Sequence, residues 1–185
     1  VILLDPSYDC YKAPILLCNA KPIRVALNDD YTPNWEQIEK AFSSETKMII
    51  INNPHNPTGK IWTEDDFIAL ENILQKFPKT IVLSDEVYEY IHFKHPHISA
   101  HSREKLQNRA IVISSFGKSF HITGWKVGYL VAADYLMLEI KKVHQFIVFS
   151  VNSIAQVAIS DYLDIVDVTK LGNFYQEKRD YFREL

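Results

Sequence analysis

The sequence predicts an α/β protein built on a mostly parallel, doubly wound β-sheet. Short apolar runs alternate with amphipathic helical patterns along all 185 residues, which is typical of helices that cross between parallel strands. Most of these runs are apolar throughout rather than at every second residue, and this indicates strands that are covered on both faces. The most polar segments of the chain directly follow four of the runs.

Six apolar runs are the expected strands, at residues 1–4, 23–27, 48–51, 81–83, 110–114 and 127–131. In a parallel sheet the carboxyl ends of the strands meet at one edge, and ligands bind there. The loops after four of the runs should therefore lie close together. These loops read DPSYD, NNPHNPTGK, SDEVYEY and SSFGK.

Five helices are expected between and after these strands. Asn34 and Thr63 are suitable amino-terminal caps for the first two. The third should run from about residue 134 to 146, the fourth should follow Asn152, and the fifth should start near Thr169. The third helix should bury Leu136, Ile140 and Val143.

Composition restricts the partners of the chain. A net charge of −3 without a basic patch predicts no nucleic-acid partner. No apolar stretch approaches the roughly 20 residues that cross a bilayer, so no membrane partner is expected. If Cys10 and Cys18 lie on one helix, they are about 12 Å apart along its axis, which is too far for a disulfide, and two free thiols favour a cytoplasmic location.

Lys118 lies in the segment SSFGKSFHITGWKVGY, and one interpretation is a phosphate-binding P-loop. The Gly-Lys-Ser order fits that motif, but the motif also needs a glycine five positions before Gly117, where this chain has Val112. A loop with one glycine cannot wrap its amides around a polyphosphate. The acidic strand end at SDE also precedes the lysine, which reverses the usual order.

A second interpretation concerns the histidine-rich segment IHFKHPHISAH, because imidazole-rich tracts can bind zinc. The spacing fits neither a helical nor a finger pattern, and Pro96 interrupts it. We therefore expect a surface loop and no metal site. The histidines concerned are His92, His95, His97 and His101.

The third interpretation is that Lys118 forms a Schiff base with pyridoxal 5'-phosphate (PLP). PLP needs an amine for its aldehyde, an anion facing its ring nitrogen, a donor for its phenolate oxygen, and cations or hydroxyls for its phosphate. The polar loops contain all of these groups. In that order they are Lys118, Asp85, Tyr88 and the pair Ser115 and Lys126, with Asn56 and Tyr8 beside them.

Taken together, the motifs DPSYDCY, NNPHNPTGK, SDEVYEY and SSFGKSFHITGWKVGY resemble those of the fold type I PLP-dependent aminotransferases of class I and II. The resemblance is strongest to the kynurenine and methionine aminotransferase branch and extends over all 185 residues. It implies that residues 1–165 are a PLP-binding large domain without its amino-terminal part, and that 127–131 is its one antiparallel strand. It also implies that residues 166–185 begin the helix leading to a carboxyl-terminal small domain.

The same resemblance implies three catalytic residues. Lys118 would bond the PLP aldehyde and then carry a proton between the substrate and the cofactor. Asp85 would pair with the ring nitrogen, and Tyr88 would hydrogen-bond the phenolate oxygen. The acid next to Asp85, Glu86, is expected to serve packing or a local hydrogen bond instead.

Four further residues are implied to bind the cofactor. Asn56 would join Tyr88 at the phenolate oxygen, and Tyr8 would stack on the ring face. Ser115 and Lys126 would hold the phosphate. Many relatives have arginine at the position of Lys126, and lysine keeps the charge without the planar two-pronged contact.

The implied activity is reversible transfer of an amino group from an L-amino acid to a 2-oxo acid. The donor would be of the methionine, aromatic, kynurenine or glutamine type, and the full-length protein would be a homodimer. Two alternatives remain open: a PLP-dependent cysteine-conjugate beta-lyase, which uses the same residues, and a catalytically incompetent fragment. Because family segments that bind the phosphate and the substrate carboxylate fall outside these residues, residues 1–185 alone are expected to be inactive, and 127–131 to be an unprotected sheet edge.

Overall fold

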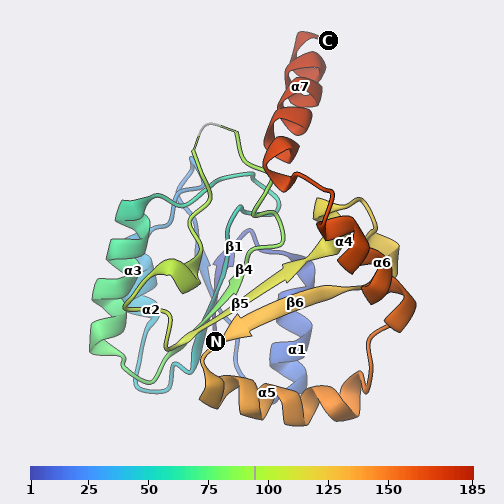
Figure 1. The fold of residues 1–185 in the computed structure, drawn as a ribbon. Helices are drawn as coiled ribbons and strands as arrows, with labels where there is room; N and C mark the ends of the chain where they lie inside the picture. Colours follow the sequence, from blue (N-terminus) through green and yellow to red (C-terminus); the bar gives the residue numbers. More distant parts are fainter. Residues whose placement is uncertain (94) are drawn as a thin grey trace.

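The computed structural model describes residues 1–93 and 95–185, and its centre is a six-stranded sheet in the order β2-β1-β3-β4-β5-β6 (Figure 1). The first five strands pair in parallel, and β6 runs antiparallel to β5. The predicted fold class, including the antiparallel strand at 127–131, is confirmed. The strands are β1 Ile2–Asp5, β2 Ile23–Ala26, β3 Met48–Asn52, β4 Ile81–Asp85, β5 Ala110–Ser115 and β6 Gly128–Ala132.

Helices surround this sheet and also extend beyond it. The α-helices are α1 Lys12–Leu17, α2 Trp35–Ala41, α3 Glu64–Lys76, α4 Phe116–Ser119, α5 Asp134–Ile147, α6 Ser153–Leu163 and α7 Leu171–Glu184. The 3₁₀ helices are η1 Asp9–Tyr11, η2 Ala100–Ser102, η3 Thr123–Trp125 and η4 Val168–Lys170. Among the described residues, none of the helices combines the length and the apolar character that crossing a membrane requires.

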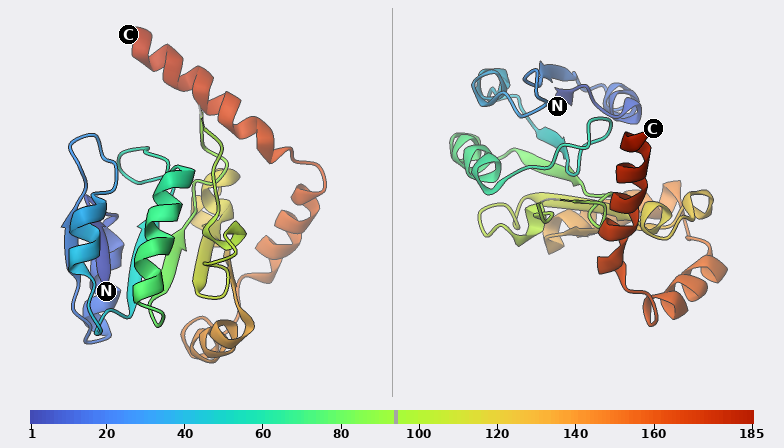
Figure 2. Two further views of the ribbon diagram at one scale, coloured as in Figure 1. Left: turned by 90° about the vertical axis from the view of Figure 1, so that its left-hand side faces the viewer. Right: turned by 90° about the horizontal axis from the view of Figure 1, so that it is seen from above.

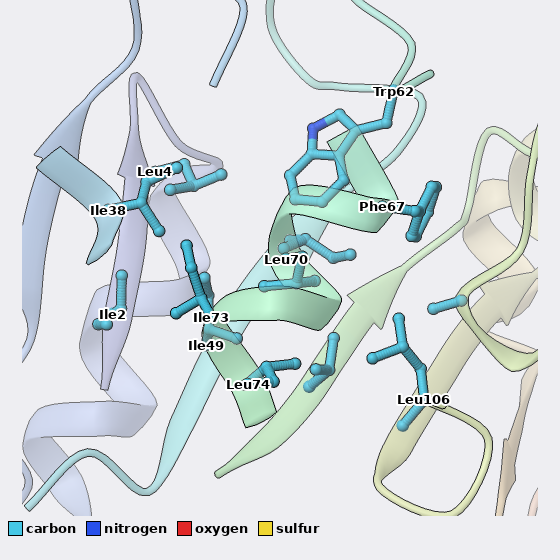
Figure 3. Packing of buried hydrophobic residues seen from close by; sticks show 14 of the residues in the cluster. Ile2, Leu4, Ile38, Ile49, Trp62, Phe67, Leu70, Ile73, Leu74 and Leu106 are labelled. Atoms are coloured by element: carbon cyan, nitrogen blue, oxygen red, sulfur yellow. The ribbon is translucent and has the colours of Figure 1, made fainter. Parts of the chain in front are cut away.

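Alternation of side chains along the strands divides the core into two layers. Ile2 and Leu4 of β1 pack with Ile38 of α2 and with the apolar face of α3, whereas Leu3 of β1 packs with Ile15 of α1. Helices α2 and α3 therefore lie on one side of the sheet and α1 on the other (Figure 2). The larger layer, under α2 and α3, is shown in Figure 3.

The expected helix caps are present. The Asn34 side chain accepts a hydrogen bond from the Gln37 amide at the start of α2, and Asn152 caps α6 in the same way. Thr63 and Asp66 form a reciprocal capping box at the start of α3. These contacts satisfy amides that a helix leaves unpaired, so they fix where each helix begins.

Two features differ from the sequence-based expectation. The short helices α1 and α4 were not expected, because neither is long enough to show a helical period. Val143 was predicted to be buried and is 56% exposed. Helix α5 buries Leu136 in its first half, while residues 141–150 are all exposed, so its second half has no described part of the chain to pack against.

Strand β6 forms one edge of the described sheet. Tyr129 and Val131 on this strand are exposed, so the expected unprotected edge is present within the described residues. At Gly128 a side chain would collide with the backbone, because a Cβ would come 2.5 Å from the Ser114 carbonyl oxygen. Glycine therefore allows β6 to approach β5 closely at the start of the strand.

Phe67 of α3 lies inside the larger core layer, since its side chain is 0% exposed and contacts the Trp62 ring. We predict that Phe67→Ala lowers the free energy of unfolding by about 3–5 kcal/mol, because it removes buried area and leaves a cavity. Ile68→Ala is the matched control, since Ile68 is 44% exposed and should cost less than about 1 kcal/mol. Urea unfolding of both variants checks this, and equal losses would contradict it.

Candidate functional site

A cavity of about 270 Å³ lies at the carboxyl edge of the parallel strands. The loops that follow β1, β3, β4 and β5 all contribute to it, as the parallel topology predicts. Six of the seven expected site residues line this cavity, and Lys126 is the exception. The lining residues are Tyr8, Tyr11, Asn52, Asn56, Asp85, Val87, Tyr88, Ile113, Ser114, Ser115 and Lys118.

Asp85 is the last residue of β4, and its side chain is buried at one wall of the cavity. One carboxylate oxygen, Oδ2, accepts a hydrogen bond from the Tyr11 hydroxyl at 2.6 Å, and Oδ1 accepts one from the Val87 amide at 3.2 Å. Burial raises the pKa of Asp85, and these two hydrogen bonds act in the opposite direction. A cation placed against this carboxylate would relieve part of the cost of burying it.

Asn52 connects the β3 loop to the end of β4. It pairs in register with Asp85, and its Nδ2 donates to the Asp85 carbonyl at 2.8 Å. Its Oδ1 accepts from the Asn56 amide at 2.6 Å. The side chain of Asn52 therefore holds the start of the NPTG turn over the carboxyl end of β4, which places Asn56 at the cavity.

Lys118 and Tyr88 both line the cavity, and the Lys118 Nζ lies over the Tyr88 ring, 5.9 Å from its centre. Burial raises the pKa of Tyr88, the charge of Asp85 adds to this, and a hydrogen bond with Asn56 opposes it. The Tyr88 hydroxyl therefore stays protonated at neutral pH and is available as a donor.

A single helical turn, α4, carries Lys118. Ser115 caps this turn, and its Oγ accepts a hydrogen bond from the Gly117 amide at 3.0 Å. A Cβ at Gly117 would lie 3.0 Å from that Oγ and 3.1 Å from the Thr123 Cα. The close packing of this turn fixes the direction in which Lys118 leaves the backbone.

Lys126 lies apart from the other expected residues. It follows η3, is exposed, and has a left-handed backbone with a φ of 57°. It does not line the cavity. Its expected contact with a phosphate group stays a prediction.

Glu86 has surroundings unlike those of its neighbour Asp85, and it points away from the cavity. It is 1% exposed and accepts hydrogen bonds from the Ser84 hydroxyl and the Ala100 amide, each at 2.8 Å. His97 Nε2 lies 2.8 Å from its other oxygen. Glu86 thus makes the local hydrogen bonds that were expected of it. Within residues 1–93 and 95–185, no cluster of three or more side chains suits a metal ion.

Sequence reasoning missed several residues of the site. Tyr11 and Asn52 lie inside the quoted motifs DPSYDCY and NNPHNPTGK, but no role was assigned to either. Tyr11 follows Tyr8 by three residues, a spacing that aligns side chains in a 3₁₀ turn. Glu89 does not line the cavity itself but accepts hydrogen bonds from Ser114, which does, and from Tyr129; it had no signal in the sequence, because these partners lie on β5 and β6.

Comparison with known proteins identifies what the chain is similar to. The family profile described as "Aminotransferase class I and II" matches residues 1–185. The chain is 42% identical over 184 residues to the methionine aminotransferase of Escherichia coli K12, covering 97% of this chain and 47% of that protein. It is 36% identical over 202 residues to a kynurenine–oxoglutarate transaminase of Dictyostelium discoideum, covering 97% and 46%.

Solved structures give the same result. The crystal structure of an Escherichia coli protein with a methionine aminotransferase function superposes with a TM-score of 0.93 at 42% identity, covering 97% of this chain and 48% of that one. The structure of an N-succinyldiaminopimelate aminotransferase from Mycobacterium tuberculosis superposes with a TM-score of 0.94 at 29% identity, covering 99% of this chain and 49% of that one. The chain spans about half the length of the relatives it matches.

The raised pKa of Asp85 predicts a pH-dependent cost in stability. The folded protein holds the proton of the Asp85 carboxyl group more tightly than the unfolded chain does, where that group has its ordinary pKa of 3.8. The ionised form therefore lowers stability above the raised pKa, and this cost disappears as the pH falls to about 4 and below. The advantage of Asp85→Asn over the wild type in free energy of unfolding should therefore grow as the pH rises from about 4 toward neutral.

Urea unfolding at several pH values checks this prediction. The control is Asp29→Asn, because Asp29 is exposed in the turn after β2 and should show little change with pH. A stability difference for Asp85→Asn that stays constant, or that shrinks as the pH rises, would contradict the prediction.

Proposed function

Since the chain belongs to the class I and II aminotransferases, we propose that it is part of an enzyme that transfers an amino group reversibly from an L-amino acid to a 2-oxo acid. The observation that carries this proposal is the cavity at which a lysine amine, a buried carboxylate and three tyrosine side chains meet. Relatives named as methionine and kynurenine transaminases support these two kinds of donor.

The residues of the cavity fit PLP by their chemistry. Bound PLP would supply an aldehyde and an electron-withdrawing pyridine ring. Lys118 is the one amine among the lining residues, and Asp85 is the one carboxylate. An amine and a buried anion are the two groups that PLP most requires, so the donor set supports this cofactor.

Each remaining lining residue has a corresponding part in this proposal. Tyr88 and Asn56 would donate to the phenolate oxygen, and the exposed ring of Tyr8 would cover the face of the cofactor ring. Ser115 lies where the β5 strand gives way to α4, and it would contact the phosphate. Lys126 would add a positive charge from the start of the β6 segment.

Lys118 is the proposed base. Lys118 is half-buried, and its Nζ lies above the Tyr88 ring on the same cavity as Asp85. When not bonded to the cofactor, this amine is free to take a proton from the substrate α-carbon and to return it. No other described residue that lines the cavity has an amine, and Asp85 is assigned to the ring nitrogen of the cofactor in this proposal.

The larger organisation of the protein belongs to the same proposal. Residues 1–165 would be the PLP-binding large domain, and 166–185, which contain α7, would begin the connection to a small domain. We also propose a homodimer in the full-length protein and a cytoplasmic location. Cys10 and Cys18 are exposed and free, which agrees with a reducing compartment.

The central test is covalent attachment of the cofactor. PLP is added to the full natural chain that contains these residues, borohydride is used to make the bond permanent, and the modified peptide is found by mass spectrometry. We predict attachment at Lys118, its loss in Lys118→Ala, and a fall in transamination of at least about 10³-fold. The control is Lys40→Ala, because Lys40 is an exposed residue of α2.

Absence of attachment in the wild type, or attachment that survives in Lys118→Ala, would contradict the proposal. Adding an amino-acid donor to the protein with bound PLP then distinguishes amino transfer from beta-elimination. Conversion of PLP to its amine form indicates transfer, whereas release of pyruvate from a cysteine conjugate indicates the beta-lyase alternative.

A further inference from the structure

Tyr11 contacts two residues of the candidate site at once. Its hydroxyl donates to Asp85 Oδ2 at 2.6 Å, across 74 positions in the sequence. The edge of its ring meets the Tyr8 ring, with the centroids 5.5 Å apart and the planes at 82°. One side chain therefore joins the group expected at the ring nitrogen of the cofactor to the group expected on the ring face.

The local fold explains why Tyr11 can make both contacts. Tyr8 caps the 3₁₀ helix η1, and the Tyr11 amide donates to the Tyr8 carbonyl at 3.2 Å. With three residues per turn, the side chains of Tyr8 and Tyr11 leave this turn on the same side. Tyr8 is 44% exposed, and the edge of the Tyr11 ring is one of the contacts that hold its ring from the side.

The hydroxyl of Tyr11 is suited to hold a carboxylate. Burial raises the pKa of Tyr11 strongly, and the Asp85 charge and hydrogen bond add to this, so the hydroxyl stays a neutral donor at working pH. A neutral donor stabilises the anion and leaves its negative charge in place. A lysine or arginine side chain would instead neutralise that charge. The titratable groups around Asp85 are Tyr8 and Tyr11 from η1, Glu86 and Tyr88 after β4, and Lys118 from α4.

We propose that Tyr11 is a positioning residue for the cofactor site, with its hydroxyl fixing the Asp85 carboxylate and its ring edge fixing the Tyr8 ring. This inference rests on the proposed function and adds a residue to it. Without the hydroxyl, Asp85 Oδ2 loses its side-chain donor and the carboxylate is free to turn about its remaining hydrogen bond with the Val87 amide.

The first test needs no cofactor. In chains labelled with ¹³C at the aspartate carboxyl carbons, the Asp85 signal is identified by its absence in Asp85→Asn and is titrated with pH. Tyr11→Phe should move the Asp85 midpoint up by about one pH unit, since a hydrogen bond to a charged group is lost. The control is Tyr135→Phe, which removes an exposed hydroxyl bonded to the Asn108 carbonyl and should leave the midpoint unchanged.

The second test measures PLP binding to the full natural chain. Tyr11→Phe should weaken binding by about tenfold, and Tyr135→Phe should not. In the Asp85→Asn background the Phe substitution should add little, because its partner is already altered. Tyr11→Leu should still weaken binding in that background, because it also removes the ring edge that supports Tyr8.

The outcomes are distinguishable. An Asp85 midpoint that does not move in Tyr11→Phe overturns the inference, and so does a midpoint that moves without any loss of PLP affinity. Wild-type protein that binds no PLP overturns the proposed function and, with it, the cofactor role of Tyr11. Full PLP binding by the wild type together with selective loss in the two Tyr11 variants supports both.

Discussion

The parallel register of β3, β4 and β5 is the constraint on which the site depends. It sets Asn52 beside Asp85 and Asp85 beside Ile113, so that the loops after these strands open toward the same side. The apolar residues of the strands set this register, because a slip of one residue would turn them away from the core. The positions of the polar loops therefore depend on apolar residues that lie far from the cavity. Packing of the core under α2 and α3 and the geometry of the site are thus parts of one arrangement.

The adjacent acids Asp85 and Glu86 have different roles: Asp85 lines the cavity, and Glu86 holds a neighbouring loop. Asp85 ends β4 and faces the cavity, whereas Glu86, the next residue, contacts the loop that carries His97 and Ala100. Glu86 has donors for both of its oxygens and joins β4 to that loop. Asp85 has only two donors and retains room for another charged group.

Most of the fold was predictable because its signals are local. Continuous apolar runs marked the strands, and Asn34 and Thr63 marked the helix starts. The grouping of six site residues followed from parallel topology together with family motifs. The Tyr11–Asp85 contact was not predictable, since it joins residues 74 positions apart. The exposure of Val143 was missed because an apolar pattern predicts a buried face without saying what covers it.

The tight turn at Gly117 restricts how this segment can change during evolution. Any larger residue there would push against Ser115 and the backbone of Thr123, and the displaced turn would swing the amine of its neighbour. To make room for a larger side chain at residue 117, Ser115 and the backbone of Thr123 would both have to move, and one further substitution does not move both. The size of residue 117, the rotamer of Ser115 and the path of the backbone at Thr123 are therefore coupled, and a larger side chain at 117 needs both neighbours to shift.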